Sequence, residues 1–276
     1  MRKIILIIII SVVIGLIVWI ALPAGLTFAG LHPEYQGPRP SFPGGKALII
    51  TTSHNRLGGN GDKTGVFASE MTAPYYEFTE AGMNVDLASI DGGRIPIDPL
   101  SFVWAIRSSY DDRYLDDSDF QEKVAHSLTV EEVDFTGYDM IYLAGGWGAA
   151  YDLGTSQALA DGITRAYAAN TVIGGVCHGP LGLLLARDET GAPLVKGRRL
   201  TAVTDKQVEE LGITMTPHHP ERELRAAGAV FESETRFRDL FANHVVVDGL
   251  LVTGQNQNAG AEVAIRMMEI AKGENR

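Results

Sequence analysis

From Lys46 onwards, short runs of apolar residues alternate with longer stretches in which apolar residues recur every three or four positions. The short runs predict buried strands, and the longer stretches predict amphipathic helices. The expected strands are 46–53, 84–89, 139–145, 171–177 and 198–204, and the expected helices are 66–81, 117–127, 154–169, 179–186, 205–211 and 258–272. This alternation predicts βαβ units and therefore an α/β fold, a three-layer sandwich whose mainly parallel sheet is covered on both faces.

The end of the chain follows a different pattern. The stretch HVVVDGLLVTG, residues 244–254, holds two apolar runs around an Asp-Gly pair, which predicts a β-hairpin. The sequence shows no internal repeat and no second domain, so residues 46–276 are expected to form one folded unit.

The N-terminal pattern is apolar on every side. Arg2 and Lys3 precede residues 4–22, which are 19 residues without a charge and long enough to span a bilayer. The sequence therefore predicts a signal anchor over 1–22, with a cytoplasmic N-terminus and the rest of the chain outside the cytoplasm. Cleavage near Ala29, followed by secretion, is the alternative. Residues 23–45 hold five of the twelve prolines and predict an extended Pro/Gly-rich linker.

Composition narrows the possible functions. The chain of 276 residues is 45% hydrophobic and carries a net charge of −11. This acidity argues against nucleic acid as a partner. The single cysteine excludes internal disulfides and cysteine-based zinc sites.

Two polar clusters are expected to be structural rather than metal-binding. The five Asp of 111–119 predict a solvated loop leading into a helix, because their spacing is not that of a calcium loop. His218 and His219 precede PERELRAAG, which predicts a surface helix with Pro in its first turn. No metal is expected.

No cofactor is expected either. The stretch GGNGDKTG, residues 58–65, resembles a phosphate loop, but Asp62 stands where such a loop needs Gly, directly before the Lys. No G-x-G-x-x-G motif opens a helix after a strand, which argues against nicotinamide or flavin cofactors.

The only cysteine, Cys177, lies where a predicted strand gives way to a predicted helix, within TVIGGVCHGPLGLLLA. A strand–turn–helix elbow of this kind presents a nucleophile in hydrolases of another family. At a helix N-terminus the pKa of the thiol is expected to fall, which would activate the thiolate. Backbone N–H groups of the elbow, including that of His178, and those of Gly145 and Gly146 are candidates to stabilise an oxyanion.

Four motifs give the chain a resemblance to a known family. These are GDKTGVFASE (61–70), LAGGWGAAYDL (143–153), GVCHGP (175–180) and LLVTGQNQNAGAEVA (250–264). In this order they resemble the ThiJ/PfpI superfamily, which has a flavodoxin-like, class I glutamine amidotransferase-like fold. The branch they resemble contains glutathione-independent glyoxalases and stress-induced holdase chaperones. The resemblance runs from about Lys46 to Lys272, so the N-terminal segment and linker lie outside it.

The resemblance implies roles for individual residues. It implies that Cys177 is the nucleophile, that Glu70 is a carboxyl group beside the thiol, and that His178 belongs to a Cys-His-acid arrangement. The acid would be Glu209 or Asp205, with Glu209 preferred. One residue departs from the pattern, because many relatives have Gly-His-Gly where this chain has Trp147 between glycines. Trp147 is expected to form a wall of the pocket.

The resemblance also implies an activity. The expected reaction is the cofactor-independent conversion of a 2-oxoaldehyde such as methylglyoxal to D-lactate, or the removal of early glycation adducts from protein side chains. A holdase chaperone and a Cys peptidase or amidase are the alternatives. Relatives are often homodimers, which makes a second copy of the chain a candidate partner.

Overall fold

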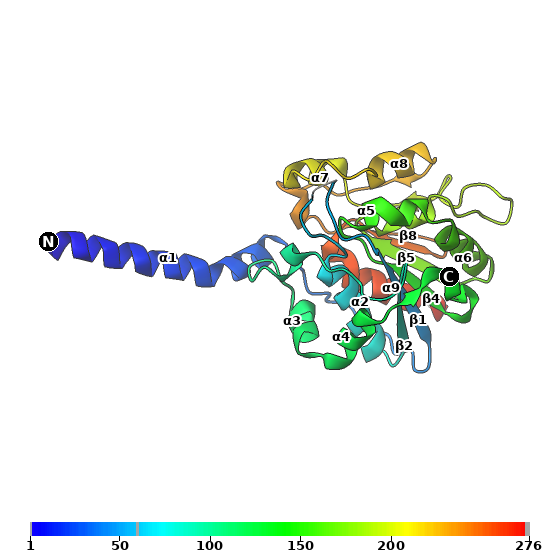
Figure 1. Cartoon of the computed structure of the whole chain (residues 1–276), viewed down its shortest axis with the longest axis horizontal. Coiled ribbons are helices and arrows are strands. Elements are labelled where there is room, and N and C mark those ends of the chain that lie inside the picture. The colour runs from blue at the N-terminus through cyan, green and yellow to red at the C-terminus, as the bar shows by residue number, and fades with distance from the viewer. Residues whose placement is uncertain (1, 59–60, 274–276) are drawn as a thin grey trace.

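The computed structural model of the chain describes residues 2–58 and 61–273, with an α/β architecture (Figure 1). Seven strands form one sheet in the order β3-β2-β1-β4-β5-β9-β8. Their bounds are β1 Lys46–Thr51, β2 Asn84–Ser89, β3 Leu128–Thr129, β4 Met140–Leu143, β5 Val172–Val176, β8 Val245–Asp248 and β9 Leu251–Gly254. All neighbours are parallel except β8 and β9, which form an antiparallel hairpin. The predicted α/β class with a mainly parallel sheet is confirmed.

Helices cover both faces of this sheet. One face carries α2 (Ala68–Glu80), α3 (Ser109–Asp116), α4 (Ser118–Ala125) and α9 (Gly260–Ala271), and the other carries α5 (Ala149–Asp152) and α6 (Gln157–Ala168). A smaller layer holds α7 (Asp205–Leu211), α8 (Pro220–Ala226) and a two-stranded sheet of β6 (Arg199–Leu200) and β7 (Val230–Phe231). Short 3₁₀ helices are η1 Pro99–Phe102, η2 Val130–Glu132, η3 Phe135–Gly137, η4 Leu153–Thr155, η5 Gly179–Leu183, η6 Asp239–Phe241 and η7 Gln257–Ala259.

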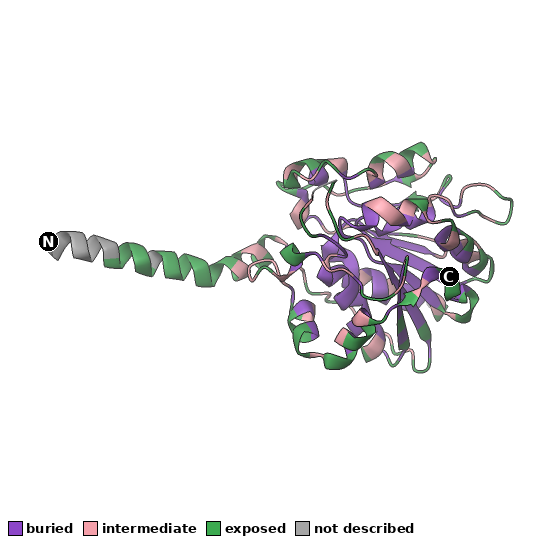
Figure 2. Ribbon diagram, in the orientation of Figure 1, coloured by how far each residue is buried: buried purple, intermediate pink, exposed green. Residues whose placement is uncertain are grey.

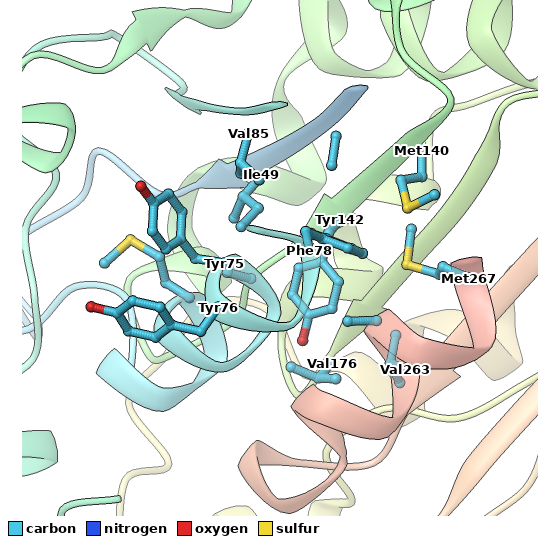
Figure 3. Packing of buried hydrophobic residues seen from close by; sticks show 14 of the residues in the cluster. Ile49, Tyr75, Tyr76, Phe78, Val85, Met140, Tyr142, Val176, Val263 and Met267 are labelled. Atoms are coloured by element: carbon cyan, nitrogen blue, oxygen red, sulfur yellow. The ribbon is translucent and has the colours of Figure 1, made fainter. Parts of the chain in front are cut away.

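The two faces of the sheet account for the unbroken apolar runs of the strands. Side chains alternate between faces along a strand, so a strand covered on both sides needs apolar residues at every position. In β1, Ile49 packs towards α2 and α9, whereas Leu48 and Ile50 pack towards α6. Figure 3 shows the first of these layers, in which Tyr142 of β4 lies close to Phe78 of α2. Figure 2 shows the resulting buried centre of the domain.

Several local expectations need correction. The run 198–204 was expected to join the main sheet, but only Arg199–Leu200 is a strand, and it pairs with β7 instead. The segment 179–186 was expected to be an α-helix, yet only Gly179–Leu183 is helical and it forms a 3₁₀ turn. Residues 111–116 are helical rather than a solvated loop, because the buried Asp111 caps α3 together with Ser108.

The N-terminal helix is longer than expected. Helix α1 runs from Arg2 to Ala29 through Pro23, so residues 23–29 are helical and not an extended linker. Within the described part of the chain, Ile9–Ala29 is a helical stretch long and apolar enough to cross a membrane. Cleaved signal sequences share this length and composition. None of this stretch is buried, and Figure 2 shows α1 extending away from the domain.

The remaining linker residues, 30–45, pack on the domain instead of hanging free. The backbone N–H of His32 donates to the side-chain oxygen of Asn258 at 2.8 Å. Arg39 forms an ion pair with the buried Glu77 of α2 at 3.1 Å. Leu31 is buried. The segment that joins α1 to β1 is therefore fixed to the domain by specific contacts.

Candidate active site

Cys177 lies directly after β5, in a backbone conformation that few non-glycine residues adopt. Its φ is +58°, in the left-handed region, and such strain persists only where the surroundings enforce it. Here the backbone N–H of Cys177 donates to the carbonyl oxygen of Gly254 at 3.1 Å, and its carbonyl oxygen accepts from the N–H of Val203 at 3.0 Å. These two bonds hold the thiol at the carboxyl end of the sheet, where ligands bind in open α/β folds.

Glu70 reaches the same point from the first turn of α2. Its side chain is buried and forms a hydrogen bond with the Cys177 thiol. Burial raises the pKa of Glu70 to about 8, although the thiol and the backbone N–H groups of Gly145 and Gly146 oppose this rise. The carboxyl group therefore holds its proton at neutral pH and releases it only slightly above, a range suited to general acid–base work.

The glycine pair after β4 allows the carboxyl group to approach this closely. A methyl group built on Gly145 would lie 2.6 Å from Glu70 Oε2, a distance at which neither group could stay in place. Gly146 has a φ of +91°, and a methyl group there would lie 2.3 Å from the backbone nitrogen of Phe67. Both positions require glycine, which explains the motif that follows the strand.

Of the three backbone N–H groups expected to stabilise an oxyanion, those of Gly146 and His178 face the sulfur, whereas that of Gly145 donates to Glu70. Both favour the thiolate, but burial and the neighbouring Glu70 outweigh them and raise the pKa of Cys177 above its ordinary value. The expectation of a lowered thiol pKa is therefore wrong. A 3₁₀ turn of five residues follows the elbow in place of an α-helix, so its dipole is too small to offset burial.

His178 is buried beside the thiol, with Nδ1 3.4 Å from Sγ of Cys177. Burial lowers the pKa of its imidazole to about 3, and the neighbouring His219 acts in the same direction. The ring is thus neutral throughout the physiological range. Its other nitrogen, Nε2, is buried without a hydrogen-bond partner in the described part of the chain.

Neither acid expected to orient His178 reaches it. Glu209 is exposed on α7, because the inward positions of that helix are taken by Gln207 and Val208, and position 209 points away from them. Asp205 begins α7 and pairs with Arg222 at 3.3 Å. The predicted Cys-His-acid triad is therefore not assembled, which weighs against the peptidase alternative.

A cavity of about 140 Å³ opens in front of the thiol. Trp147 forms part of its wall and packs against the His178 ring, with centroids 5.0 Å apart. The other lining residues are Phe67, Glu70, Leu100, Ile106, Gly146, Cys177, His178, Val203, Gln207, Leu211, Ile213, Leu240 and Gln257. Most of these residues could not be identified from the sequence, because they come from loops and helix ends, whose apolar residues follow no regular period.

Tyr142 is a further group that the sequence analysis did not single out. Its hydroxyl is buried without a hydrogen-bond partner among the described residues. Burial raises the pKa of this phenol well above its usual value, and the nearby Glu70 and Cys177 add to the rise. Within residues 2–58 and 61–273 no three His, Cys, Asp or Glu side chains are arranged to hold a metal ion.

Comparison with known proteins agrees with this geometry. The profile of the DJ-1/PfpI family matches residues 63–270, which include the elbow, the glycine pair and Glu70. The chain belongs to the DJ-1/PfpI family. Helix α1 and residues 30–45, which pack on the domain, lie outside the family match.

Within the DJ-1/PfpI family the chain is similar to fungal proteins named as glyoxalases. It is 29% identical to the glutathione-independent glyoxalase HSP31 of Saccharomyces cerevisiae over 236 residues, which cover 82% of this chain and 98% of the relative. It is 29% identical to Glyoxalase 3 of Candida albicans, covering 79% of this chain and 95% of the relative.

Two solved structures show the same fold. The crystal structure of glyoxalase III from Candida albicans matches with a TM-score of 0.75 and 28% identity, over 82% of this chain and 97% of that one. The Rapid Encystment Protein 24 KDa of Francisella tularensis matches with a TM-score of 0.76 and 30% identity, over 82% of this chain and 99% of that one.

Proposed function

We propose that the chain is a cofactor-independent glyoxalase that converts 2-oxoaldehydes such as methylglyoxal to 2-hydroxy acids such as D-lactate without glutathione. The observation that carries the proposal is the buried contact between the Cys177 thiol and the Glu70 carboxyl group, set before a cavity and beside two backbone donors. The fungal relatives named as glutathione-independent glyoxalases support it.

The reaction starts with the ionised fraction of Glu70, which takes the proton of the Cys177 thiol. The thiolate adds to the aldehyde carbon C1, and the proton now on Glu70 passes to the C1 oxygen, which gives a hemithioacetal. The backbone N–H groups of Gly146 and His178 face the sulfur and stabilise the negative charge that develops on this oxygen.

Glu70 then moves a proton between the two carbons. As carboxylate it removes the hydrogen on C1, which gives an enediolate with its charge on the C2 oxygen. The hydroxyl proton on C1 passes to the C2 oxygen, and Glu70 as acid returns its own proton to C2, which gives the thioester. C1 is oxidised and C2 is reduced within one molecule, so the step needs no external oxidant or reductant. Water hydrolyses the resulting thioester, which releases the 2-hydroxy acid and restores the thiol.

The same groups would serve the removal of early glycation adducts, since these also carry a carbon skeleton derived from a 2-oxoaldehyde. Exposed apolar side chains, including those of Met215 and Phe237, keep a holdase function as a second candidate. A holdase acts through its surface, so it would survive the loss of Cys177, whereas both enzymatic activities would not.

We propose further that α1 anchors the chain in a membrane through residues 4–22, with the domain outside the cytoplasm. The positive charges of Arg2 and Lys3 before the apolar stretch favour this orientation. Secretion after cleavage near Ala29 is the alternative. Protease treatment of cells whose cytoplasmic membrane is intact tests the orientation. The protease is expected to digest an extracytoplasmic domain, whereas a cytoplasmic domain would be protected by the membrane.

The activity is tested with the full chain in detergent micelles, given methylglyoxal and no glutathione. Wild type is expected to form D-lactate, and Cys177→Ala is expected to form none above the uncatalysed background. Glu80→Gln changes an exposed carboxylate of the same helix, α2, and serves as the matched control. Absence of lactate from wild type, or equal lactate from Cys177→Ala, would refute the proposal.

A further inference from the structure

The cavity in front of Cys177 is far more apolar than a three-carbon substrate requires. Apolar side chains make up most of its wall. The polar side chains are fewer and come from α2, the elbow, α7 and η7: Glu70, His178, Gln207 and Gln257. Methylglyoxal has a single methyl group to place against this wall. Most of the apolar lining would therefore face either water or nothing while such a substrate reacts.

Apolar side chains also continue from the cavity to the outer surface. Leu100 and Leu211 line the cavity and are themselves 50% and 41% exposed. Val103, Met215 and Phe237 are exposed on the adjoining segments, and these five residues are called the anchor-side rim below. Phe237 is 94% exposed between Arg236 and Arg238, an arrangement suited to the boundary between acyl chains and phosphate headgroups.

Helix α1 lies next to the same rim. Trp19 of α1 contacts Trp104, with ring centroids 4.1 Å apart, and Trp104 belongs to the loop between the lining residues Leu100 and Ile106. The side chain of His32, just after α1, donates from Nε2 to the carbonyl oxygen of Ile106 at 2.8 Å.

A third contact joins the end of α1 to the opposite wall. A methyl group built on Gly30 would lie 2.9 Å from the carbonyl oxygen of Phe241, the neighbour of the lining residue Leu240. Trp19 of α1 and the two residues Gly30 and His32 just after it therefore lie against segments that carry the lining residues Leu100, Ile106 and Leu240. In Figure 1 the helix leaves the domain on the side of α3 and α7, away from the C-terminus.

The position of Trp19 in α1 indicates where the anchor-side rim lies relative to the bilayer surface. Residues 4–22 span the bilayer in the arrangement proposed above, which places Trp19 within one turn of the outer end of the span. Trp side chains concentrate at this interface. Trp104, whose ring contacts that of Trp19, then lies at the same level, and it brings Leu100 and Val103 to the membrane surface.

We infer that the cavity opens onto the outer surface of the bilayer and that the substrates of the enzyme are 2-oxoaldehydes with an aliphatic chain, which partition into the membrane. This inference rests on the proposed glyoxalase function. The chain of the substrate lies along the apolar wall and rim, and the dicarbonyl end reaches Cys177. The chemical steps are unchanged, and the product is a 2-hydroxy acid whose carboxylate favours release to water.

The first test compares kcat/KM for 2-oxooctanal and for methylglyoxal, using the full chain reconstituted in phosphatidylcholine vesicles. Burial of the longer chain is expected to raise kcat/KM about tenfold or more over methylglyoxal. Leu100→Asp and Val103→Asp are expected to lower this ratio about tenfold, because the charges oppose entry of an alkyl chain from the bilayer. Leu128→Asp changes a residue with similar exposure on the edge strand β3, away from the cavity, and should leave the ratio at its wild-type value.

The second test does not depend on turnover. Alkylation of the single cysteine by N-ethylmaleimide and by N-octylmaleimide is followed by the mass of the protein. The octyl reagent is expected to react faster in wild type, and this preference is expected to fall in Val103→Asp but not in Leu128→Asp. The alkylation is carried out in the same phosphatidylcholine vesicles as the first test. The octyl reagent partitions into these vesicles equally for every variant, so a difference in preference between variants reports on the protein.

The two tests separate the possible failures. If neither aldehyde is turned over but the octyl preference depends on Val103, the glyoxalase proposal fails together with the assignment of the substrates, whereas the opening of the cavity towards the bilayer stands. If methylglyoxal is turned over and neither test shows a preference for the longer chain, the glyoxalase proposal stands and this inference is overturned. An octyl preference that Val103→Asp and Leu128→Asp leave equally unchanged would also overturn it.

Discussion

The Nδ1 atom of His178 lies 3.4 Å from Sγ of Cys177, while Nε2 of the same ring is buried with no hydrogen-bond partner among the described residues. A hydrolase triad needs a carboxylate at this second nitrogen to hold and charge the ring. Here burial keeps the imidazole neutral, with a pKa of about 3. Control of the thiol therefore falls to Glu70, the carboxyl group that forms a hydrogen bond with it.

Replacement of Glu70 by Gln keeps the shape of the side chain and removes its acid–base chemistry. We expect Glu70→Gln to lower kcat/KM for methylglyoxal about 100-fold or more. Because the reaction needs ionised Glu70, the wild-type rate is expected to rise with pH and to level off above about 8, the pKa of that group. Rates of D-lactate formation across pH measure both effects, and a rising limb that persists in Glu70→Gln would contradict the assignment.

The same substitution should change stability in the opposite direction to activity. The folded state holds the proton of Glu70 up to about pH 8, whereas the unfolded chain releases it near 4.5. The free energy of unfolding of wild type therefore falls as pH rises between these values, by at most about 1.4 kcal/mol for each pH unit. Glu70→Gln has no titrating group at this position, so its free energy of unfolding should not show this contribution to the fall with pH.

Urea unfolding of both proteins in the same detergent tests this expectation. The stability advantage of Glu70→Gln should be small near pH 5 and largest at about pH 8. An advantage that is constant over this range would show that the Glu70 carboxyl group is not held in its protonated form by the fold.

Removal of the carboxylate at position 209 should have little effect. Glu209 is exposed on α7 and does not reach His178, so Glu209→Gln is expected to keep kcat/KM within about twofold of wild type. The pH dependence of the rate should also stay unchanged. A loss of about tenfold or more would restore Glu209 as the acid behind His178.

The glycine pair offers a test of the site geometry. Gly146→Ala places a methyl group 2.3 Å from the backbone of Phe67 at a φ of +91°, which should abolish activity and destabilise the fold by more than about 2 kcal/mol. Gly191 has a similar φ of +81° but nothing within 4 Å of the added methyl group. Gly191→Ala should therefore cost only the backbone strain, about 1–2 kcal/mol, and keep activity. Equal effects of the two substitutions on activity would show that the close contact at Gly146 is unimportant.

The sequence predicted those features that depend on local pattern. The strand over 84–89 and the hairpin around Asp248-Gly249 follow from the period and the turn residues, and the structure has both. The elbow at Cys177 follows from its glycines and its place after a strand. Glu70 is different, because periodicity alone marks it only as a polar residue in a helix, and a family motif was needed to single it out.

The errors have physical causes. Glu209 was preferred to Asp205 from the family resemblance alone, which does not determine how α7 is rotated, and in the structure position 209 faces outward while Gln207 faces inward. The thiol pKa was expected to fall because a helix was expected after the elbow, and burial proved the larger effect. The apolar wall could not be predicted, since Ile213 and Leu240 come together only when the loops that carry them fold over the sheet end.

The most direct test of the account is the initial rate of D-lactate formation from methylglyoxal by wild type and by Cys177→Ser, each measured with and without glutathione. Serine keeps the size of the side chain but replaces the thiol by a far weaker acid and nucleophile. Wild type is expected to need no glutathione and to show no increase in rate when glutathione is added, and Cys177→Ser is expected to react at the uncatalysed background. A wild-type rate that requires or is raised by glutathione, or a Cys177→Ser rate equal to that of wild type, would contradict this mechanism.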